Sequence, residues 1–224
     1  MLGVTDLTKT YGDATALDEV SVSWDEGLHC LAGPNGSGKT TLLRVLAGLT
    51  RADSGGVTVP DSLGVAFQTP NVYPDLTVAE NLDVFGALAD ADDDWRASLV
   101  DQLRLGPVVG RTASDLSGGF RKKLDLALAL LKRPDALLLD EPLADLDPAT
   151  RRRLVATAVR YSDDHPVVAS THHLDAFSED YATLTVVVDG RVAGAWDRSD
   201  APASPAAVYE RTLAASEAGR GNGF

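Results

Sequence analysis

A glycine-rich segment holds the most specific chemistry in the sequence. Residues 33–40 read Gly-Pro-Asn-Gly-Ser-Gly-Lys-Thr, after a short apolar run and before a helical pattern. Glycines at this spacing let successive backbone N–H groups curve around an anion, and the N-terminus of the following helix adds partial positive charge. Lys39 then reaches the terminal phosphates of a nucleotide, and Thr40 offers its hydroxyl to Mg²⁺. The alternative is a glycine-rich turn with a chance lysine. The predicted nucleotide contacts here are Gly33, Pro34, Asn35, Gly36, Ser37, Gly38, Lys39, Thr40 and Thr41.

Two adjacent carboxylates follow a second apolar run. Three leucines at 137–139 lead directly into Asp140 and Glu141. In an open parallel sheet, the carboxyl end of a buried strand faces the ligand crevice. Asp140 is then placed to hold Mg²⁺, and Glu141 to polarise an attacking water. The alternative is a solvated turn, which is less favoured because the apolar strand delivers both carboxylates to the edge that carries the phosphate loop.

A third motif narrows the interpretation. Residues 116–119 read Leu-Ser-Gly-Gly, between the phosphate loop and Asp140, at the start of a helix expected over 120–132. Ser117 can cap that helix, while Gly118 and Gly119 present N–H groups to an anion; in isolation such a segment is most often a loop. Taken with the preceding motifs, it resembles the signature of the ABC-family nucleotide-binding domain. The resemblance runs from residue 2 to about 196, nearly the whole chain.

The resemblance implies further site residues. Gln68 follows the strand expected over 63–67, where the family has a glutamine that touches Mg²⁺. Residues 143–147 look like the family's D-loop. His172 matches the switch histidine that contacts the γ-phosphate, with His173 as a solvated neighbour. Tyr11 matches the aromatic residue that stacks on adenine; the alternative is a turn tyrosine packed on the sheet. The implied catalytic residues are Glu141, His172 and Lys39, and the implied metal ligands are Thr40, Gln68 and Asp140.

One position departs from the family pattern. The signature usually continues with Gln, where this chain has Phe120, followed by Arg121, Lys122 and Lys123. A phenyl ring cannot make the amide hydrogen bonds that Gln offers near a ribose. The alternative is that Phe120 packs on the sugar or on a neighbouring side chain.

Alternating and apolar runs predict the elements that carry these residues. Antiparallel strands are expected in the first 25 residues around a turn at 11–13, and a closing hairpin is expected over 186–196. Buried strands are expected at 28–32, 63–67, 136–139 and 167–170, with helical patterns at 39–47 and 78–105. The predicted fold is α/β: a P-loop NTPase core with a mostly parallel sheet, an antiparallel β edge and a small inserted helical lobe at about 75–132. Residues 1–200 form the expected ATPase domain, and 201–224 a short C-terminal tail with one short helix around 206–216.

Composition bounds the class of protein. The 224 residues include 33 acidic and 20 basic side chains, a formal net charge of -13, so no nucleic-acid partner is expected. The longest apolar runs, such as 126–131, are far below the roughly 18–20 residues that span a bilayer, and no signal peptide is visible. Cys30 is the only cysteine, which favours a reducing cytoplasm. The acidity indicates adaptation to a high-salt cytoplasm, with an ordinary acidic cytosolic protein as the alternative.

The resemblance implies a function. Two such domains would sandwich two ATP molecules with Mg²⁺, each phosphate loop facing Ser117–Gly119 of the opposite domain. The expected protein is the ATP-hydrolysing subunit of an ABC membrane transporter, homo- or heterodimeric, with a separate membrane permease as partner. It is expected in the cytoplasm at the inner face of the cell membrane. The alternatives are a soluble non-transport ABC ATPase and a regulatory ATP-binding subunit that a heteromeric partner completes.

Overall fold

A six-stranded sheet forms the centre of the molecule. The computed structural model describes residues 1–201 and 203–221, with side chains described to residue 218. The strand order is β5-β6-β7-β3-β8-β9, and every neighbouring pair is parallel except β8 with β9. Its strands are β3 (Gly27–Ala32), β5 (Leu63–Ala66), β6 (Ala136–Asp140), β7 (Pro166–Ser170), β8 (Tyr181–Val188) and β9 (Arg191–Asp197). All residues of β6 and β7 are buried, as expected for strands covered on both faces.

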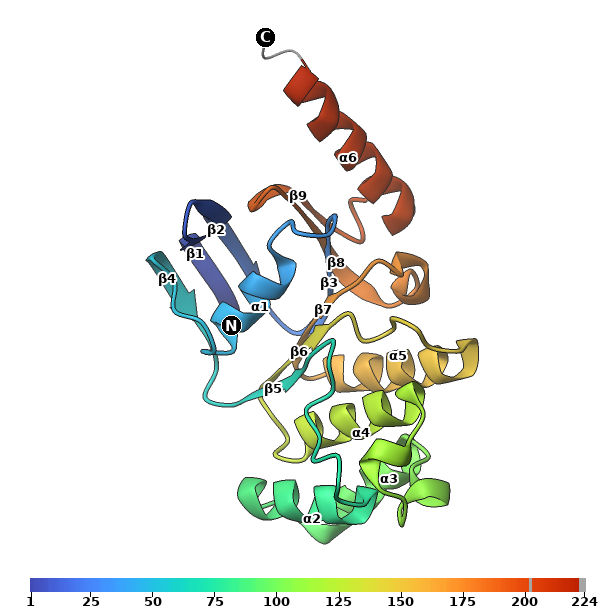
Figure 1. The fold of residues 1–224 in the computed structure, drawn as a ribbon. Coiled ribbons are helices and arrows are strands. Elements are labelled where there is room, and N and C mark those ends of the chain that lie inside the picture. The colour runs from blue at the N-terminus through green and yellow to red at the C-terminus, as the bar shows by residue number, and fades with distance from the viewer. Residues whose placement is uncertain (202, 222–224) are drawn as a thin grey trace.

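A three-stranded antiparallel sheet and one helix cover the first face. The order is β2-β1-β4, with β1 (Leu2–Tyr11), β2 (Ala14–Trp24) and β4 (Ser54–Thr58). Helix α1 (Lys39–Leu46) lies between the two sheets in Figure 1 and buries Leu42 and Leu43 completely. Burying each of these side chains stabilises the packing by about 2 kcal/mol. The helix therefore holds the end of the phosphate loop in a fixed place between two sheets.

Helices cover the second face. α4 (Gly118–Leu130) and α5 (Pro148–Ser162) pack on the sheet, while α2 (Val78–Ala89) and α3 (Asp93–Gln102) pack on α4 farther from it (Figure 1). The 3₁₀ turns η1 (Gly106–Val108) and η2 (Ala113–Asp115) connect α3 to α4. Thr77 and Glu80 form a reciprocal capping box at the start of α2, and Asp147 caps α5. These caps fix where each helix begins.

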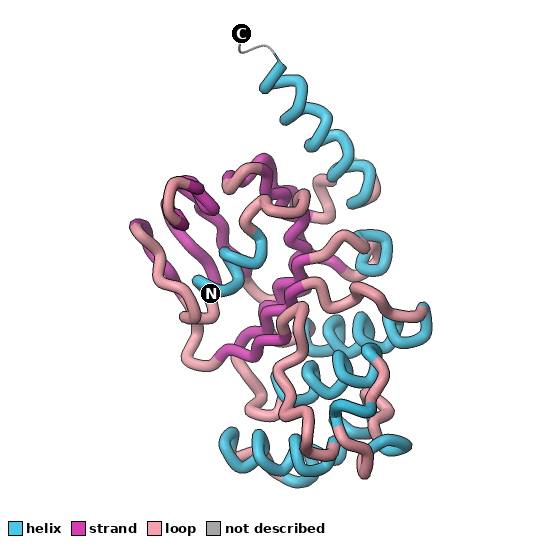
Figure 2. The backbone as a smooth tube through the Cα atoms, viewed as in Figure 1, coloured by secondary structure: helices cyan, strands magenta, loops and turns pink. Residues whose placement is uncertain are grey.

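The C-terminal helix α6 (Pro205–Gly221) packs by its first half and then projects from the body (Figures 1 and 2). Val208, Tyr209 and Leu213 contact the core beside β8, β9 and the 3₁₀ turn η3 (Leu174–Phe177). The helix predicted around 206–216 is present but is longer than predicted, from Pro205 to Gly221, and residues 202 and 222–224 of the expected tail lie outside the described part. Among the described helices, none combines the length and apolar character that a bilayer crossing requires. The α/β class, the mostly parallel sheet and the antiparallel edge are confirmed.

Candidate nucleotide site

The phosphate loop joins β3 to α1, as its spacing predicts. Gly38 is the N-cap of α1 with φ 106, and a Cβ there would lie 2.4 Å from the carbonyl oxygen of Ala16. Only glycine fits this position, because the backbone is both left-handed and in close contact. The loop is closed by a hydrogen bond from the Ser37 N–H to the Pro34 carbonyl, at 3.2 Å, and is tied to the sheet by Gly190, whose N–H donates to the Ser37 carbonyl at 3.0 Å. The curve is therefore built into the fold.

Lys39 is buried at the start of α1. Its Nζ donates to the carbonyl oxygens of Gly33, at 2.7 Å, and Pro34, at 3.1 Å, so the ammonium lies against the loop. Burial lowers the pKa of Lys39, while the nearby carboxylates of Glu141 and Asp140 raise it. Among the described residues that line the cleft, Lys39 is the one lysine or arginine and Glu141 the one carboxylate, and Asp140 lies close to both.

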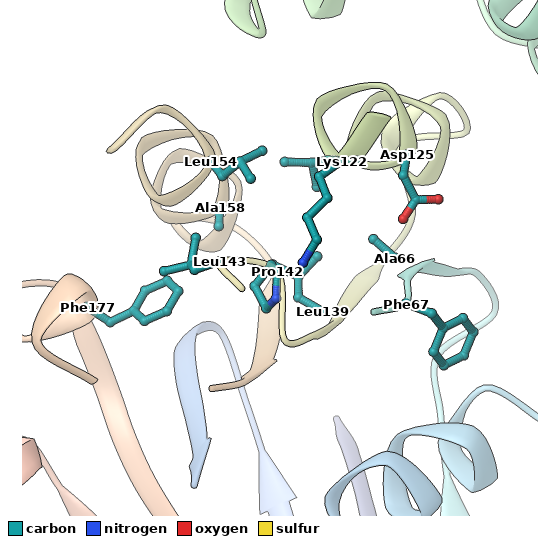
Figure 3. A pocket seen from close by; sticks show the side chains of 11 residues that line it. Ala66, Phe67, Lys122, Asp125, Leu139, Pro142, Leu143, Leu154, Ala158 and Phe177 are labelled. Atoms are coloured by element: carbon teal, nitrogen blue, oxygen red, sulfur yellow. The ribbon is translucent and has the colours of Figure 1, made fainter. Parts of the chain in front are cut away.

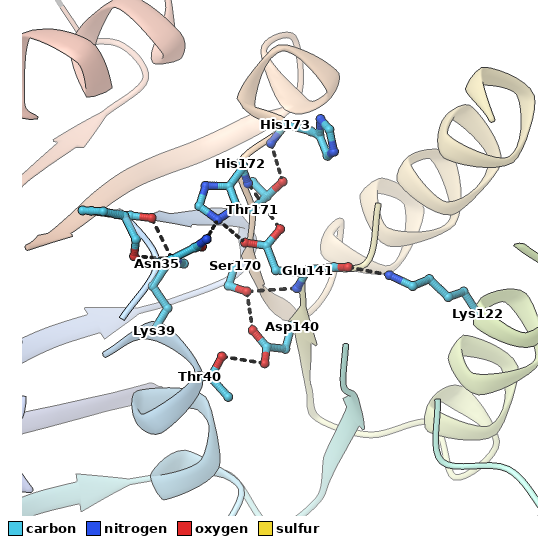
Figure 4. Close-up of polar contacts among 12 residues, drawn as sticks. Asn35, Lys39, Thr40, Lys122, Asp140, Glu141, Ser170, Thr171, His172 and His173 are labelled. Atoms are coloured by element: carbon cyan, nitrogen blue, oxygen red, sulfur yellow. Dashed lines mark hydrogen bonds and ion pairs between the residues drawn. The ribbon is translucent and has the colours of Figure 1, made fainter. Parts of the chain in front are cut away.

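Thr40 and Asp140 meet at the floor of the site. The Thr40 hydroxyl donates to Asp140 Oδ2 at 2.9 Å, although the two residues are 100 positions apart. Ser170, the last residue of β7, donates from Oγ to Asp140 Oδ1 at 2.6 Å. Asp140 is 2% exposed, so both of its oxygens are fixed inside the protein (Figure 4). A hydroxyl and a carboxylate held at this distance provide the hard oxygen atoms that Mg²⁺ prefers.

Glu141 and His172 meet above that floor. The His172 Nε2 lies 3.1 Å from Glu141 Oε1 and 3.1 Å from Asn35 Oδ1, and only the contact with Asn35 has hydrogen-bond geometry (Figure 4). Glu141 Oε1 is consequently a buried oxygen without a hydrogen-bond partner among the described residues, as is Ser37 Oγ. A buried acceptor left in this way is costly, and at a site it marks a place for a ligand or water.

One cleft of about 440 Å³ brings the predicted residues together. Ala144, from the segment expected to be the D-loop, and Ala16, which the sequence did not single out, complete its wall. The predicted residues that line it are Asn35, Gly36, Ser37, Gly38, Lys39, Thr40, Thr41, Gln68, Glu141 and His172. Asp140 lies beneath the cleft, where it accepts a hydrogen bond from Thr40. The volume, the cationic loop and the oxygen atoms on the floor fit a nucleotide triphosphate with Mg²⁺.

Other predicted residues lie outside this cleft. Tyr11, at the end of β1, is 49% exposed and has the Lys9 ammonium 5.3 Å from its ring centroid. Ser117 and Gly118 are exposed at the start of α4, and Gly118 lines a separate groove beside Gln68. The signature therefore does not contact the cleft of its own chain. His173, expected to be a solvated neighbour, points away from the cleft but is partly buried (Figure 4).

Ser170 is a site residue that sequence reasoning missed. Besides Asp140, it holds the backbone N–H of Glu141, which donates to Ser170 Oγ at 3.0 Å and to the Ser170 carbonyl at 3.1 Å. The available signal was a hydroxyl at the end of an otherwise apolar strand that neighbours the strand of the two carboxylates. It orients both of them.

Comparison with known proteins agrees with this geometry. The family model described as ABC transporter matches residues 17–144, more than half of the chain. The chain therefore belongs to the ABC transporter family. The match begins in β2 and ends just beyond Glu141, so it includes the phosphate loop, the signature and both acidic residues.

Individual relatives are named as ATP-binding proteins. It is 36% identical over 211 residues to the Nod factor export ATP-binding protein I of Ralstonia nicotianae, covering 85% of this chain and 65% of that protein. It is 35% identical over 178 residues to an aliphatic sulfonates import ATP-binding protein of Burkholderia cenocepacia, covering 75% and 66%. The chain thus spans just under two thirds of the length of these relatives.

Solved structures share the fold. A structure described as the ATP-binding subunit of an ABC transporter superimposes with a TM-score of 0.86 at 21% identity, covering 95% of this chain and 99% of that one. A dimeric bacterial ABC transporter cassette gives 0.81 at 23% identity, covering 88% and 99%. These likenesses confirm the P-loop NTPase core with its helical insertion.

Proposed function

We propose that this chain is the ATP-hydrolysing subunit of an ABC membrane transporter. The observation that carries the proposal is the convergence of Lys39, Thr40, Asp140, Glu141 and His172 on one cleft. A regulatory subunit without hydrolysis would not need a buried carboxylate with an unpartnered oxygen next to a histidine. The names of the relatives, which are ATP-binding proteins of export and import systems, support the same assignment.

The residues divide the chemistry among themselves. The N–H groups of the loop and the Lys39 ammonium bind and neutralise the phosphates of ATP. Thr40 and Asp140, with Gln68 at the rim, hold Mg²⁺, which supplies further positive charge for the transferring phosphoryl group when bound. Glu141 Oε1 accepts a hydrogen bond from the attacking water, and His172 orients Glu141 from 3.1 Å. Tyr11 provides a stacking surface for the adenine at the outer edge.

A second copy, or a related chain, completes each site. Ser117 and Gly118 are exposed and lie away from the cleft of their own chain, where they offer the N–H groups of a helix N-terminus to another molecule's nucleotide. The likeness of the fold to a dimeric ABC cassette supports this arrangement. The γ-phosphate then attracts both partners, and hydrolysis removes that attraction.

The proposed partner in the membrane is a separate permease subunit, with this chain on the cytoplasmic side of the membrane. Residues 1–200 act as the ATPase domain, with the helical lobe at about 75–132, and 201–224 as a tail. The strongly negative charge adapts the protein to molar salt, where the Debye length falls to about 3 Å and self-repulsion is screened.

The test is Mg-ATP hydrolysis by the purified chain beside Glu141→Gln, from about 0.1 M to several molar salt, a range across which surface charges become fully screened. We expect hydrolysis by the wild type, loss in the variant, an ATP-dependent dimer of the variant, and a molar salt optimum. ATP binding without hydrolysis or dimerisation at any salt would contradict a self-sufficient homodimer and point to a partner that completes the site. An optimum at low salt would contradict only the salt adaptation.

A further inference from the structure

Glu141 has an unusual backbone for the residue it is. Its φ is 47, in the left-handed region that residues with a Cβ rarely adopt. Such a conformation is unfavourable for a residue with a Cβ and persists only when surrounding contacts determine it. On its amino side, the N–H is held by Ser170.

The Glu141 carbonyl accepts two hydrogen bonds. One comes from the N–H of Ala144 at 3.3 Å, which closes the local turn, and the other from Lys122 Nζ at 2.7 Å. Lys122 lies on α4, 19 residues earlier, so this bond joins two elements rather than one turn (Figure 4). A hydrogen bond from an ammonium is roughly twice as strong as one between neutral groups.

The side chain of Lys122 lines a cavity, which fixes its direction. It extends along this apolar cavity, which Leu139, near the end of β6, and Pro142 and Leu143, just after it, also line (Figure 3). Burial lowers the pKa of Lys122, while Asp145, Glu141, Asp125 and Asp140 raise it. An amine directed along an apolar wall to one carbonyl oxygen has a defined position, unlike a surface lysine.

The neighbouring lysine shows that this aim is specific. Lys123 Nζ lies 3.8 Å from the centroid of the Phe120 ring on the same helix, so its ammonium is directed to its own helix and not to Glu141. Two consecutive lysines thus have separate partners, one local and one in the site.

We infer that Lys122 is a positioning residue, which holds the backbone of Glu141 and ties the orientation of that carboxylate to helix α4. The inference rests on the proposed function, since α4 is also the helix that begins at Ser117. Lys122 is five residues after Ser117, about 7.5 Å along the helix axis. A displacement of α4 by a nucleotide bound to the opposite copy therefore reaches Glu141 of the same chain through one hydrogen bond.

The experiment compares Lys122→Met, which keeps the aliphatic stem, with Lys122→Arg, which keeps the charge. Lys132→Met is the matched control, since it removes one charge from the exposed turn that follows α4. We expect Lys122→Met to lower kcat about 10- to 100-fold, as for a misplaced catalytic group, with the Kd for Mg-ATP unchanged. Lys122→Arg should recover most of the rate, and Lys132→Met should retain it.

A double variant tests whether Lys122 acts through Glu141. Since both changes act through one carboxylate, adding Lys122→Met to Glu141→Gln should leave the residual hydrolysis rate of Glu141→Gln unchanged. Losses that multiply, an unchanged kcat in Lys122→Met, or a parallel loss of ATP binding would overturn the inference.

A crystal structure of Lys122→Met decides the matter without activity. A Glu141 that leaves the left-handed region supports the inference, and an unmoved Glu141 overturns it. If the wild type hydrolyses no ATP, the proposed function fails, and this structural result still stands for Lys122.

Discussion

The two ends of this chain's nucleotide-handling surface differ in how completely they are built. In the cleft, hydrogen bonds connect Thr40, Asp140, Ser170 and Glu141 across distant parts of the sequence. At the signature, the hydroxyl of Ser117 accepts one hydrogen bond, from the N–H of Phe120 at 3.4 Å, and it is exposed. The cleft is therefore held together by hydrogen bonds within the chain, while the signature is exposed at the surface. Under the proposed function, nucleotide binding requires only the cleft, while hydrolysis also requires the signature of a second copy.

The largest effect should follow from a change at the cleft. Asp140→Asn weakens the acceptor of both Thr40 and Ser170 and removes the charge meant for Mg²⁺. We expect kcat/KM for Mg-ATP to fall on the order of 10³-fold or more. Steady-state hydrolysis assays measure it, with Asp94→Asn on the exposed start of α3 as the control for lost charge. A loss below tenfold would contradict the role of Asp140.

The stability of the protein should depend on pH through Asp125, which lies on the helix that begins after Ser117. Asp125 on α4 accepts a hydrogen bond at 2.8 Å from the N–H of Asn71, in the segment after Gln68, and burial raises the pKa of Asp125 to about 7. The folded protein thus binds a proton more tightly than the unfolded chain. Stability should therefore fall as pH rises from about 4 to about 7, by at most about 4 kcal/mol, and then level off.

Asp125→Asn removes this titration and keeps an oxygen acceptor for Asn71. Urea unfolding of the variant should show a smaller stability loss between pH 4 and 8 than the wild type, and greater stability at pH 8. Identical pH profiles for the two proteins would show that folding does not change the pKa of Asp125, and would contradict this prediction.

A change in the signature should separate binding from hydrolysis. Ser117→Arg places a bulky cation at the start of α4, outside the chain's own cleft. We expect hydrolysis to fall about 100-fold, since the donors of the second copy are blocked, with ATP binding by the monomer within about twofold of the wild type. Parallel loss of both, measured by nucleotide titration and sedimentation, would mean that Ser117 serves its own cleft.

The smallest effect should come from the departure at Phe120. Its ring packs under the Lys123 ammonium, which is one of the two alternatives expected from the sequence. Phe120→Gln gives up a cation–π contact of about 0.5–1 kcal/mol and gains the amide that the family usually carries. We expect a slightly lower unfolding temperature and a hydrolysis rate within about threefold of the wild type. A gain of tenfold or more would show that Phe120 limits closure on the nucleotide.

The sequence identified the residues that line the cleft, but not the residues that hold them in position. Lys39, Thr40, Asp140 and Glu141 lie in contiguous motifs whose residue types follow from phosphate and metal chemistry. Ser170 and Lys122 act through contacts with residues 29 and 19 positions away, and no local pattern records such a contact. Their roles appear only when β6, β7 and α4 lie side by side.

The fold shows the same division. The four buried strands β3, β5, β6 and β7 were predicted within one residue at each end, while β8 begins at Tyr181, five residues before the hairpin predicted from residue 186. β4 was missed, since the sequence Ser-Gly-Gly-Val-Thr is exposed along its length and becomes a strand only by pairing with β1. Helix α5 was also missed, because Arg151, Arg152 and Arg153 interrupt the apolar pattern before the buried Leu154.

The central sheet has a consequence for how the molecule can diverge. Along β6, Ala136 and Leu138 belong to the core shared with α1, while Leu137 and Leu139 belong to the core under the helices. Each strand thus supplies two separately packed interiors with alternate side chains. Mutations that reshape the helical interior change neighbours that the phosphate-loop interior never touches. Evolutionary variants of this chain can therefore change the surface of the helices, and the proteins that bind there, without altering the packing around the phosphate loop.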